Sequence, residues 1–240
     1  MPRRKDKRQV SPVPSAKLAE APFDNAGADL ILQSSDEVHF HVFKNIISIA
    51  SPVFAVMFSL PLPPSGKQLR DASGVQVVSL SEHSTALDIA LRHIYPVRTP
   101  KGDKLHYASI LSEFARKYQV ETWDEFITGY LTDSIERDPV GVYAIAVTYG
   151  FNDVGAKAAR TCLNLPFSRL QSPYLRYITP EDLSELYMYH VACGKAASAL
   201  ASSDRIWVSM LEQNGSFSRV CQSCSILDFI DLTSTSHGGS

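Results

Sequence analysis

The chain has 240 residues, of which 45% are hydrophobic and 20% are charged, so it can bury a sizeable core and wholesale disorder is excluded. The formal net charge of −2 gives no overall case for nucleic-acid binding. However, residues 1–17 hold six basic residues against one acidic residue, a net +5, which leaves −7 for the rest of the chain.

The first 22 residues combine this charge with Pro12, Pro14 and Pro22 and show no hydrophobic period, which predicts a disordered basic arm. The cluster could be a nuclear import signal, a weak phosphate-binding arm or simply a solvated tail. No apolar signal-peptide core follows it, and no run of about 18 apolar residues predicts a membrane span. We therefore expect a cytoplasmic or nuclear protein, or one found in both compartments.

The predicted strands cluster in the first 80 residues. An apolar run at 28–33, a turn at 34–37 and an alternating segment at 38–42 indicate a hairpin, and residues 75–80 read as a third strand. Helices are expected over 44–50, from Ser51-Pro52 through Phe58, and over 84–95. Strands followed by helices favour an α+β fold, in which helices cover a small sheet.

The remaining predicted elements are helical. They cover 105–118, a segment opened by a Thr122-x-x-Glu125 capping box, a helix from Asp138-Pro139 to Gly150, residues 152–165, and a long helix from Thr179-Pro180 to about 201. We interpret residues 136–201 as an all-helical extension and 202–240 as an irregular Ser-rich tail that contains a Cys-x-x-Cys motif.

Three motifs keep both order and spacing over about residues 27–135. They are Asp29-Leu30-x-Leu32, Phe40-x-x-Phe43-Lys44-x-x-Ile47 and Ser51-Pro52-x-Phe54-x-x-Met57-Phe58. Together they resemble the BTB/POZ domain, and the sequence of residues 44–54 looks most like that of the stand-alone BTB proteins expanded in fungi. The later helices are similar in placement to the helical extension that often follows this domain.

The resemblance implies a protein–protein interaction module, an adaptor or scaffold, without catalytic activity. The residues that define the module would be Asp29, Lys44, Phe54, Met57 and Phe58. We expect Lys44 to be the counter-charge of Asp29, unless both lie exposed at the ends of their elements.

Three departures from the family pattern bear on the partners. Phe43 stands where the family usually has His, and residues 59–81 contain no Glu, which weakens a cullin-type ubiquitin-ligase adaptor. Residues 1–22 look too polar to supply the helix and strand that many family dimers exchange. Other proteins are therefore the expected partners, with a homodimer retained as an option and a cullin as an alternative.

Four residues have ligand spacing for a structural zinc ion. His190-x-x-Cys193 falls on one face of the last predicted helix, and Cys221-x-x-Cys224 follows in the tail. The competing interpretation places His190 and Cys193 in the core, because they share a stripe with apolar residues. A zinc-stabilised nuclear regulator, which would contact nucleic acid through residues 3–8, is a rival hypothesis.

No catalytic motif stands out. The sequence contains no P-loop, no Gly-x-Gly-x-x-Gly, no Gly-x-Ser-x-Gly and no His-Glu-x-x-His. His39 and His41 alternate with apolar residues and are expected on the outward face of a strand. We therefore predict a protein that is not an enzyme and has no catalytic cofactor.

Overall fold

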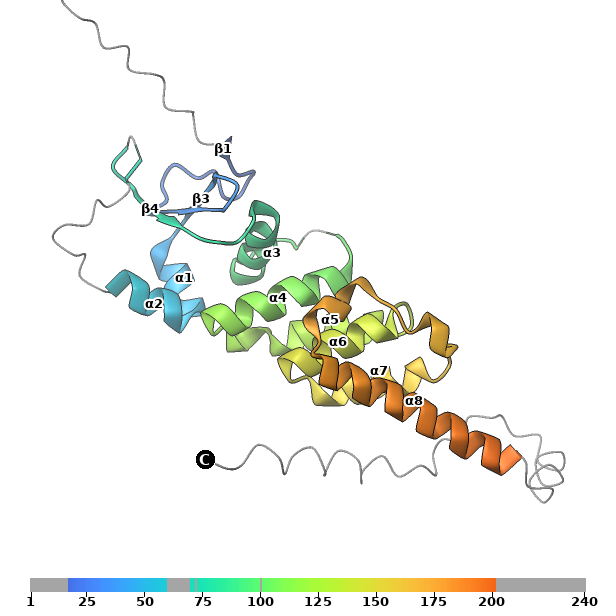
Figure 1. The fold of residues 1–240 in the computed structure, drawn as a ribbon. Coiled ribbons are helices and arrows are strands. Elements are labelled where there is room, and N and C mark those ends of the chain that lie inside the picture. Colours follow the sequence, from blue (N-terminus) through green and yellow to red (C-terminus); the bar gives the residue numbers. More distant parts are fainter. Residues whose placement is uncertain (1–16, 60–69, 72, 100, 202–240) are drawn as a thin grey trace, which may run out of the picture. The chain divides into compact units, whose positions relative to one another are not determined.

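The computed structural model describes residues 17–59, 70–71, 73–99 and 101–201 (Figure 1). The chain divides into two compact units between Tyr130 and Leu131, and each unit is described by itself. Most of the predicted arm and the whole predicted tail, including Cys221 and Cys224, lie outside the described residues.

The first unit contains a four-stranded mixed sheet in the order β1-β3-β2-β4. Its strands are β1 (Lys17–Leu18), β2 (Leu30–Gln33), β3 (Val38–Val42) and β4 (Gln76–Ser79). The predicted hairpin is confirmed as the antiparallel pair β2–β3, and the predicted third strand is β4, which pairs parallel with β2.

The burial of the hairpin follows from its residue pattern. In β3, Val38, Phe40 and Val42 are buried while His39 and His41 are half-buried, so the predicted alternation is confirmed. Residues 30–32 of β2 are all fully buried, although they point to alternate faces. Both faces of β2 are therefore covered, which accounts for the unbroken apolar run at residues 30–32.

Strand β1 lies inside the segment that the sequence predicted to be a disordered arm. Lys17 and Leu18 pair parallel with Val38 and His39, and the amide of Ala19 continues the ladder with a 2.9 Å bond to the His39 carbonyl. The prediction was wrong for residues 17–22, because two paired residues are too short to show a period. It was also wrong in supposing that this segment supplies no strand.

Helices follow the sheet in the order that the sequence predicted. They are α1 (Lys44–Ala50), α2 (Pro52–Ser59), α3 (Ser84–Ile94), α4 (Lys104–Tyr118) and α5 (Asp124–Ser134), the last of which crosses the division between the units. In Figure 1, α1 and α3 lie between the sheet and α4. The observed architecture is the predicted α+β fold.

The capping box expected at Thr122 and Glu125 does not form. Thr122 lies within a short 3-10 helix, η1 (Glu121–Trp123), and α5 begins directly after it. Trp123 is buried and its ring centroid lies 5.5 Å from that of Phe114. Packing of Trp123 on α4 therefore decides the backbone here.

The second unit is helical. It contains α6 (Pro139–Tyr149), α7 (Asn152–Cys162), the 3-10 segments η2 (Phe167–Arg169) and η3 (Pro173–Tyr177), and α8 (Pro180–Ala201). The start and end predicted for α6 are confirmed, since Asp138 caps it by accepting from the Gly141 amide and Gly150 ends it with φ of 86°. Helix α7 ends three residues earlier than predicted, because the chain tightens into turns before Pro166.

The long helix α8 begins as predicted, with the Thr179 hydroxyl accepting from the Asp182 amide at 3.1 Å. Along its described side chains, only Leu186 is fully buried. Neither α8 nor any other described helix combines the length and apolar character needed to cross a membrane.

Candidate protein-binding surface

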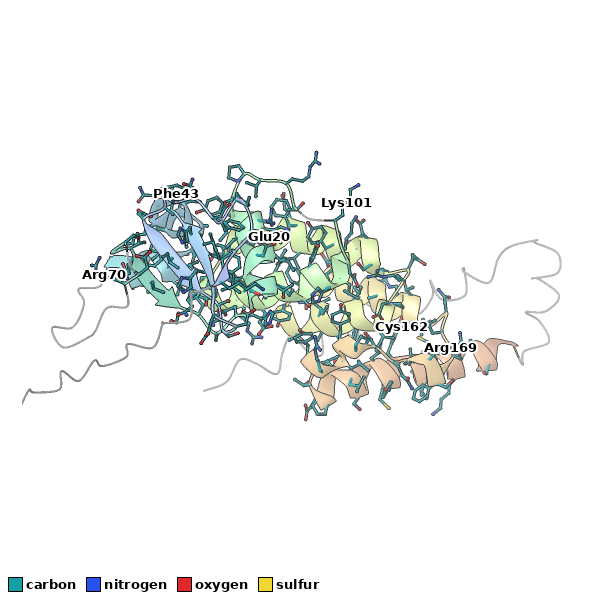
Figure 2. All side chains as sticks on the ribbon, turned by 90° about the horizontal axis from the view of Figure 1, so that it is seen from above. Glu20, Phe43, Arg70, Lys101, Cys162 and Arg169 are labelled. Atoms are coloured by element: carbon teal, nitrogen blue, oxygen red, sulfur yellow. The ribbon has the colours of Figure 1, made fainter. Side chains whose placement is uncertain are left out.

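The N-terminus of α1 is held by two groups from distant parts of the chain. Phe43, which precedes the helix (Figure 2), offers no capping side chain, and its amide donates a 2.8 Å bond to the hydroxyl of Tyr95. The next amide, that of Lys44, donates a 2.8 Å bond to Oδ1 of Asp29. Both otherwise unpaired helix-end donors are therefore satisfied by tertiary contacts. Burial is the main cause that raises the pKa of Tyr95, so this hydroxyl stays neutral.

Asp29 and Lys44 meet, but through different atoms from those expected. The Asp29 carboxylate is exposed and binds the Lys44 backbone, whereas the Lys44 ammonium donates a 2.9 Å bond to Oε1 of Gln76. The expected charge pair was therefore wrong. Asp29 is exposed, as the alternative interpretation expected, but Lys44 is half-buried. Asp29 works as a helix cap.

Ser51 joins the end of α1 to the start of α2. Its amide donates to the Ile47 carbonyl, and its hydroxyl accepts from the Phe54 amide at 3.2 Å. The same hydroxyl donates a 2.6 Å bond to the Tyr118 carbonyl at the end of α4. The cap predicted from Ser51-Pro52 is confirmed, and it also anchors the helix pair to the core.

The three residues of the motif in α2 have different roles. Phe54 is fully buried and stacks on Tyr118, with ring centroids 4.5 Å apart and an interplanar angle of 8°. Phe58 also stacks on Phe54, with ring centroids 5.7 Å apart. Met57 is 38% exposed, so it lies at the surface. Phe54 therefore maintains the fold, and Met57 is available to a partner.

Three exposed apolar side chains lie on the neighbouring helices α1 and α2. Ile49 is 87% exposed and Val56 is 58% exposed, and Met57 accompanies them. Across both helices the only charged residue is Lys44. We call Ile49, Val56 and Met57 the interaction face. Large apolar side chains that remain exposed on a surface with few charges are typical of protein-binding sites.

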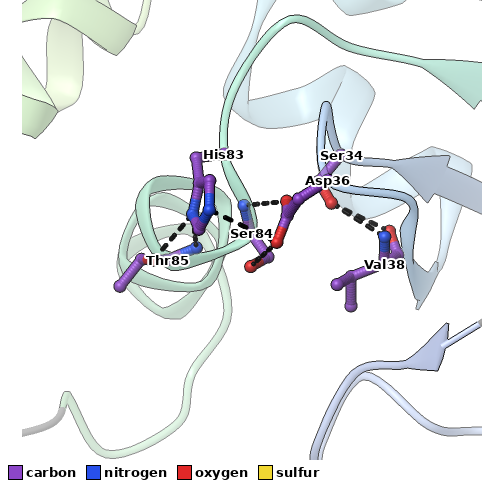
Figure 3. Close-up of polar contacts among 6 residues, drawn as sticks. All are labelled: Ser34, Asp36, Val38, His83, Ser84 and Thr85. Atoms are coloured by element: carbon purple, nitrogen blue, oxygen red, sulfur yellow. Dashed lines mark hydrogen bonds and ion pairs between the residues drawn. The ribbon is translucent and has the colours of Figure 1, made fainter.

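A second polar cluster, which the sequence did not single out, joins the hairpin turn to α3 (Figure 3). Asp36 accepts from the amide of Ser84 at 2.8 Å and from its hydroxyl at 2.7 Å, while Nε2 of His83 lies 3.4 Å from the same carboxylate. The bond from the Ser84 hydroxyl is the main cause that lowers the pKa of Asp36 well below its usual range.

Although it contains Ser, His and Asp, this cluster is a helix cap and not a catalytic triad. The Ser84 hydroxyl donates to Asp36, so it is not hydrogen-bonded to the imidazole that would act as its base. Nδ1 of His83 instead accepts from the Thr85 amide at 3.3 Å. The arrangement holds the start of α3 against the hairpin turn.

Of the four predicted zinc ligands, two are described. His190 and Cys193 are both half-buried on α8, and Nε2 of His190 donates a 3.0 Å bond to the Leu165 carbonyl. The Phe167 ring packs edge-on against His190 at 5.8 Å. Among the described residues there is no group of three or more metal-binding side chains.

Cys162 is the remaining cysteine and lies buried in α7. Burial raises the pKa of its thiol to about 12, so it is protonated and unreactive at neutral pH.

The mixed sheet, the helix pair α1–α2 and the apolar face on that pair define an α+β interaction domain. Residues 21–135 match the family model for the BTB/POZ domain. The chain therefore carries a BTB/POZ domain, a protein–protein interaction module, with further helices after it. No curated protein matches the chain.

Proposed function

We propose that the protein is a non-catalytic adaptor or scaffold that associates with a second copy of itself through the interaction face. The observation that carries this proposal is the exposure of Ile49, Val56 and Met57 on helices with Lys44 as their one charged residue. An uncharged apolar face is self-complementary, because two copies can meet without like-charge repulsion.

The sheet edge offers further support for self-association. Strand β1 pairs with β3 within the chain over only two residues, and Leu18 remains 48% exposed. A strand with so few bonds can be exchanged for the same strand of a second copy at little cost.

Light scattering after size exclusion tests the proposal on the full chain. The wild-type protein should have twice the mass of the chain. The Ile49→Glu variant should have the mass of a single chain, because association would bury the new carboxylate without a partner. Val191→Glu is the matched control, because Val191 is 39% exposed on α8, outside the interaction face. A wild-type monomer, or a dimer that survives Ile49→Glu, would contradict the proposal.

A cullin-type adaptor is the alternative, weakened by the absence of Glu from residues 59–81. Pull-down with a purified cullin separates the two. If the cullin retains the wild-type protein but does not retain the Met57→Glu variant, the interaction face binds the cullin instead of a second copy.

We also propose that His190, Cys193, Cys221 and Cys224 hold one structural zinc ion. Support comes from the bond between Nε2 of His190 and the Leu165 carbonyl, since a carbonyl can only accept. Nε2 therefore carries the proton and Nδ1 keeps its lone pair. Metal-binding histidines commonly have their second nitrogen oriented in this way.

Zinc content measured on protein purified without chelator tests this second proposal. The expected result is one zinc ion per chain, lost in Cys224→Ser, with Cys162→Ser as the control because Cys162 lies outside the proposed set. Absence of stoichiometric zinc from the wild type would contradict the zinc proposal.

Residence in the cytoplasm or nucleus, and the stand-alone fungal type, remain predictions from the sequence.

A further inference from the structure

The second part of α8 carries almost no charge. From Leu186 to Ala201, Lys195 is the only charged residue when His190 is counted as neutral. A helix side that faces water normally carries charged and polar residues. The sequence of this part is therefore typical of a helix that is covered on most of its sides.

The part of the chain that the structure describes leaves this stretch of α8 largely uncovered. From residue 186 onward only Leu186 is buried among the described side chains, and Figure 1 shows the end of the helix extending past α6 and α7. The composition of the helix and its described contacts therefore disagree. A further segment that packs on α8 would remove the disagreement.

Three exposed side chains form an apolar face on this helix. Met188 is 63% exposed, Val191 is 39% exposed, and Ala192 is also exposed. Residues three and four positions apart are neighbours on a helix surface, so Met188 lies next to both. We call these three residues the α8 face. Phe167, which is 51% exposed, lies beside it, because its ring packs at 5.1 Å on Tyr187, one turn before Val191.

The chain continues beyond α8 with an apolar cluster at residues 206–211. Its sequence, Ile-Trp-Val-Ser-Met-Leu, contains five apolar residues and no charged one. Removing such side chains from water is favourable, and an uncharged cluster can lie on the α8 face without burying an unpaired charge. The two surfaces therefore match in chemistry.

The cluster is also close enough along the chain to reach the α8 face. Met188 lies 13 residues before Ala201, which is about 20 Å at the rise of an α-helix. Trp207 follows Ala201 by six residues, which can span up to about 20 Å. A tether this short gives an effective concentration of about millimolar, so weak apolar contacts suffice within one chain. A second copy would have to bind without that advantage.

We propose that residues 206–211 dock on the α8 face of their own chain, where Trp207 is shielded from water. The docked segment supplies the cover that the composition of α8 requires, and it turns the chain back along the helix. The proposal is independent of the proposed zinc site, because residues 206–211 contain none of its four ligands.

Tryptophan fluorescence of the full chain tests this. The chain has two tryptophans, and Trp123 is buried, so subtracting the emission of Trp207→Phe from that of the wild type gives the emission of Trp207 alone. This emission should lie at shorter wavelength than that of free N-acetyltryptophanamide. Acrylamide should quench it at least about threefold less efficiently, because a packed indole ring loses most of its contact with solvent.

Met188→Glu should abolish this protection, because docking would bury an unpaired carboxylate, and Met188→Leu should keep it. Thr132→Glu is the matched control, since it adds a carboxylate at an exposed helical position outside α8. Val191→Glu should expose Trp207 without changing the mass measured by light scattering, which separates docking from self-association. Circular dichroism of each variant verifies its fold.

Quenching of Trp207 in the wild type that is as efficient as that of the free compound would overturn the proposal, whatever the fold of the variants. Protection that survives Met188→Glu would do the same. Protection that is lost on dilution would also overturn it, because the α8 face would then be covered by a second copy.

Discussion

The hydroxyl of Ser51 donates a 2.6 Å hydrogen bond to the carbonyl of Tyr118, which is 67 positions further along the chain. Both groups are buried, and Ser51 at the same time caps α2 through the Phe54 amide. One side chain therefore satisfies polar groups at the ends of two helices. This bond fixes the helix pair that presents the interaction face.

Removing this bond should be costly. Ser51→Ala leaves the Tyr118 carbonyl and the Phe54 amide without their partner, and we expect a loss of about 1–3 kcal/mol in the free energy of unfolding. Urea denaturation followed by circular dichroism measures it. Ser59→Ala removes an exposed serine of the same helix and should change stability by less than about 0.5 kcal/mol. Equal stability of the two variants would refute the anchoring role.

Phe54 and Met57 should separate stability from binding. Phe54→Ala removes a fully buried ring that stacks on Tyr118, so we expect a loss of about 3–5 kcal/mol. Met57→Ala should cost less than about 1 kcal/mol and should weaken self-association. Thermal melts and light scattering on both variants check this. A Met57→Ala protein that is strongly destabilised would place Met57 in the core.

The contribution of Asp36 to stability should depend on pH in one direction. Its pKa is lowered in the folded state by the bonds from Ser84, so its stabilisation is full above the unfolded pKa of about 3.9. It is lost as pH falls below that value toward the folded pKa. The side chain is 31% exposed, so solvent screening limits the expected effect of Asp36→Asn at pH 7 to about 1 kcal/mol.

Denaturation of wild type and Asp36→Asn at pH 7 and pH 3 measures this difference. The gap between the two proteins should narrow at pH 3. Asp24→Asn, at an exposed position before the hairpin, is the control and should show no gap at either pH. If the difference in stability widened on acidification, the pKa of Asp36 would not be lowered by folding and the prediction would be wrong.

Two helical glycines should respond oppositely to alanine. A Cβ at Gly141 would collide with Asp138 and would lie 2.6 Å from Ser172 Oγ, so Gly141→Ala should destabilise by about 1–3 kcal/mol. A Cβ at Gly129 meets nothing within 4 Å, so Gly129→Ala should stabilise α5 by about 0.5–1 kcal/mol. Unfolding midpoints test both, and a change of the same sign in the two variants would contradict the contact argument.

Much of the fold could be read from local chemistry. The alternation from Val38 to Val42, the Asp138-Pro139 start and the Gly150 end were predicted correctly, because each depends on side chains within a few residues of the backbone that they shape. The order and spacing of the BTB/POZ motifs were recognisable for the same reason. Phe54 and Met57 share one helix, however, and only their different burial showed that one supports the fold and the other lies on its surface.

The features that escaped prediction depend on partners far along the chain. Strand β1 exists through its ladder with β3, the backbone at Thr122 follows the burial of Trp123, and Asp29 caps α1 through the Lys44 amide instead of pairing with its ammonium. The sequence by itself determined which elements form and which family motifs they carry, because those signals are local. Only the tertiary structure decided which atoms meet, because a contact across the chain depends on packing that no short window contains.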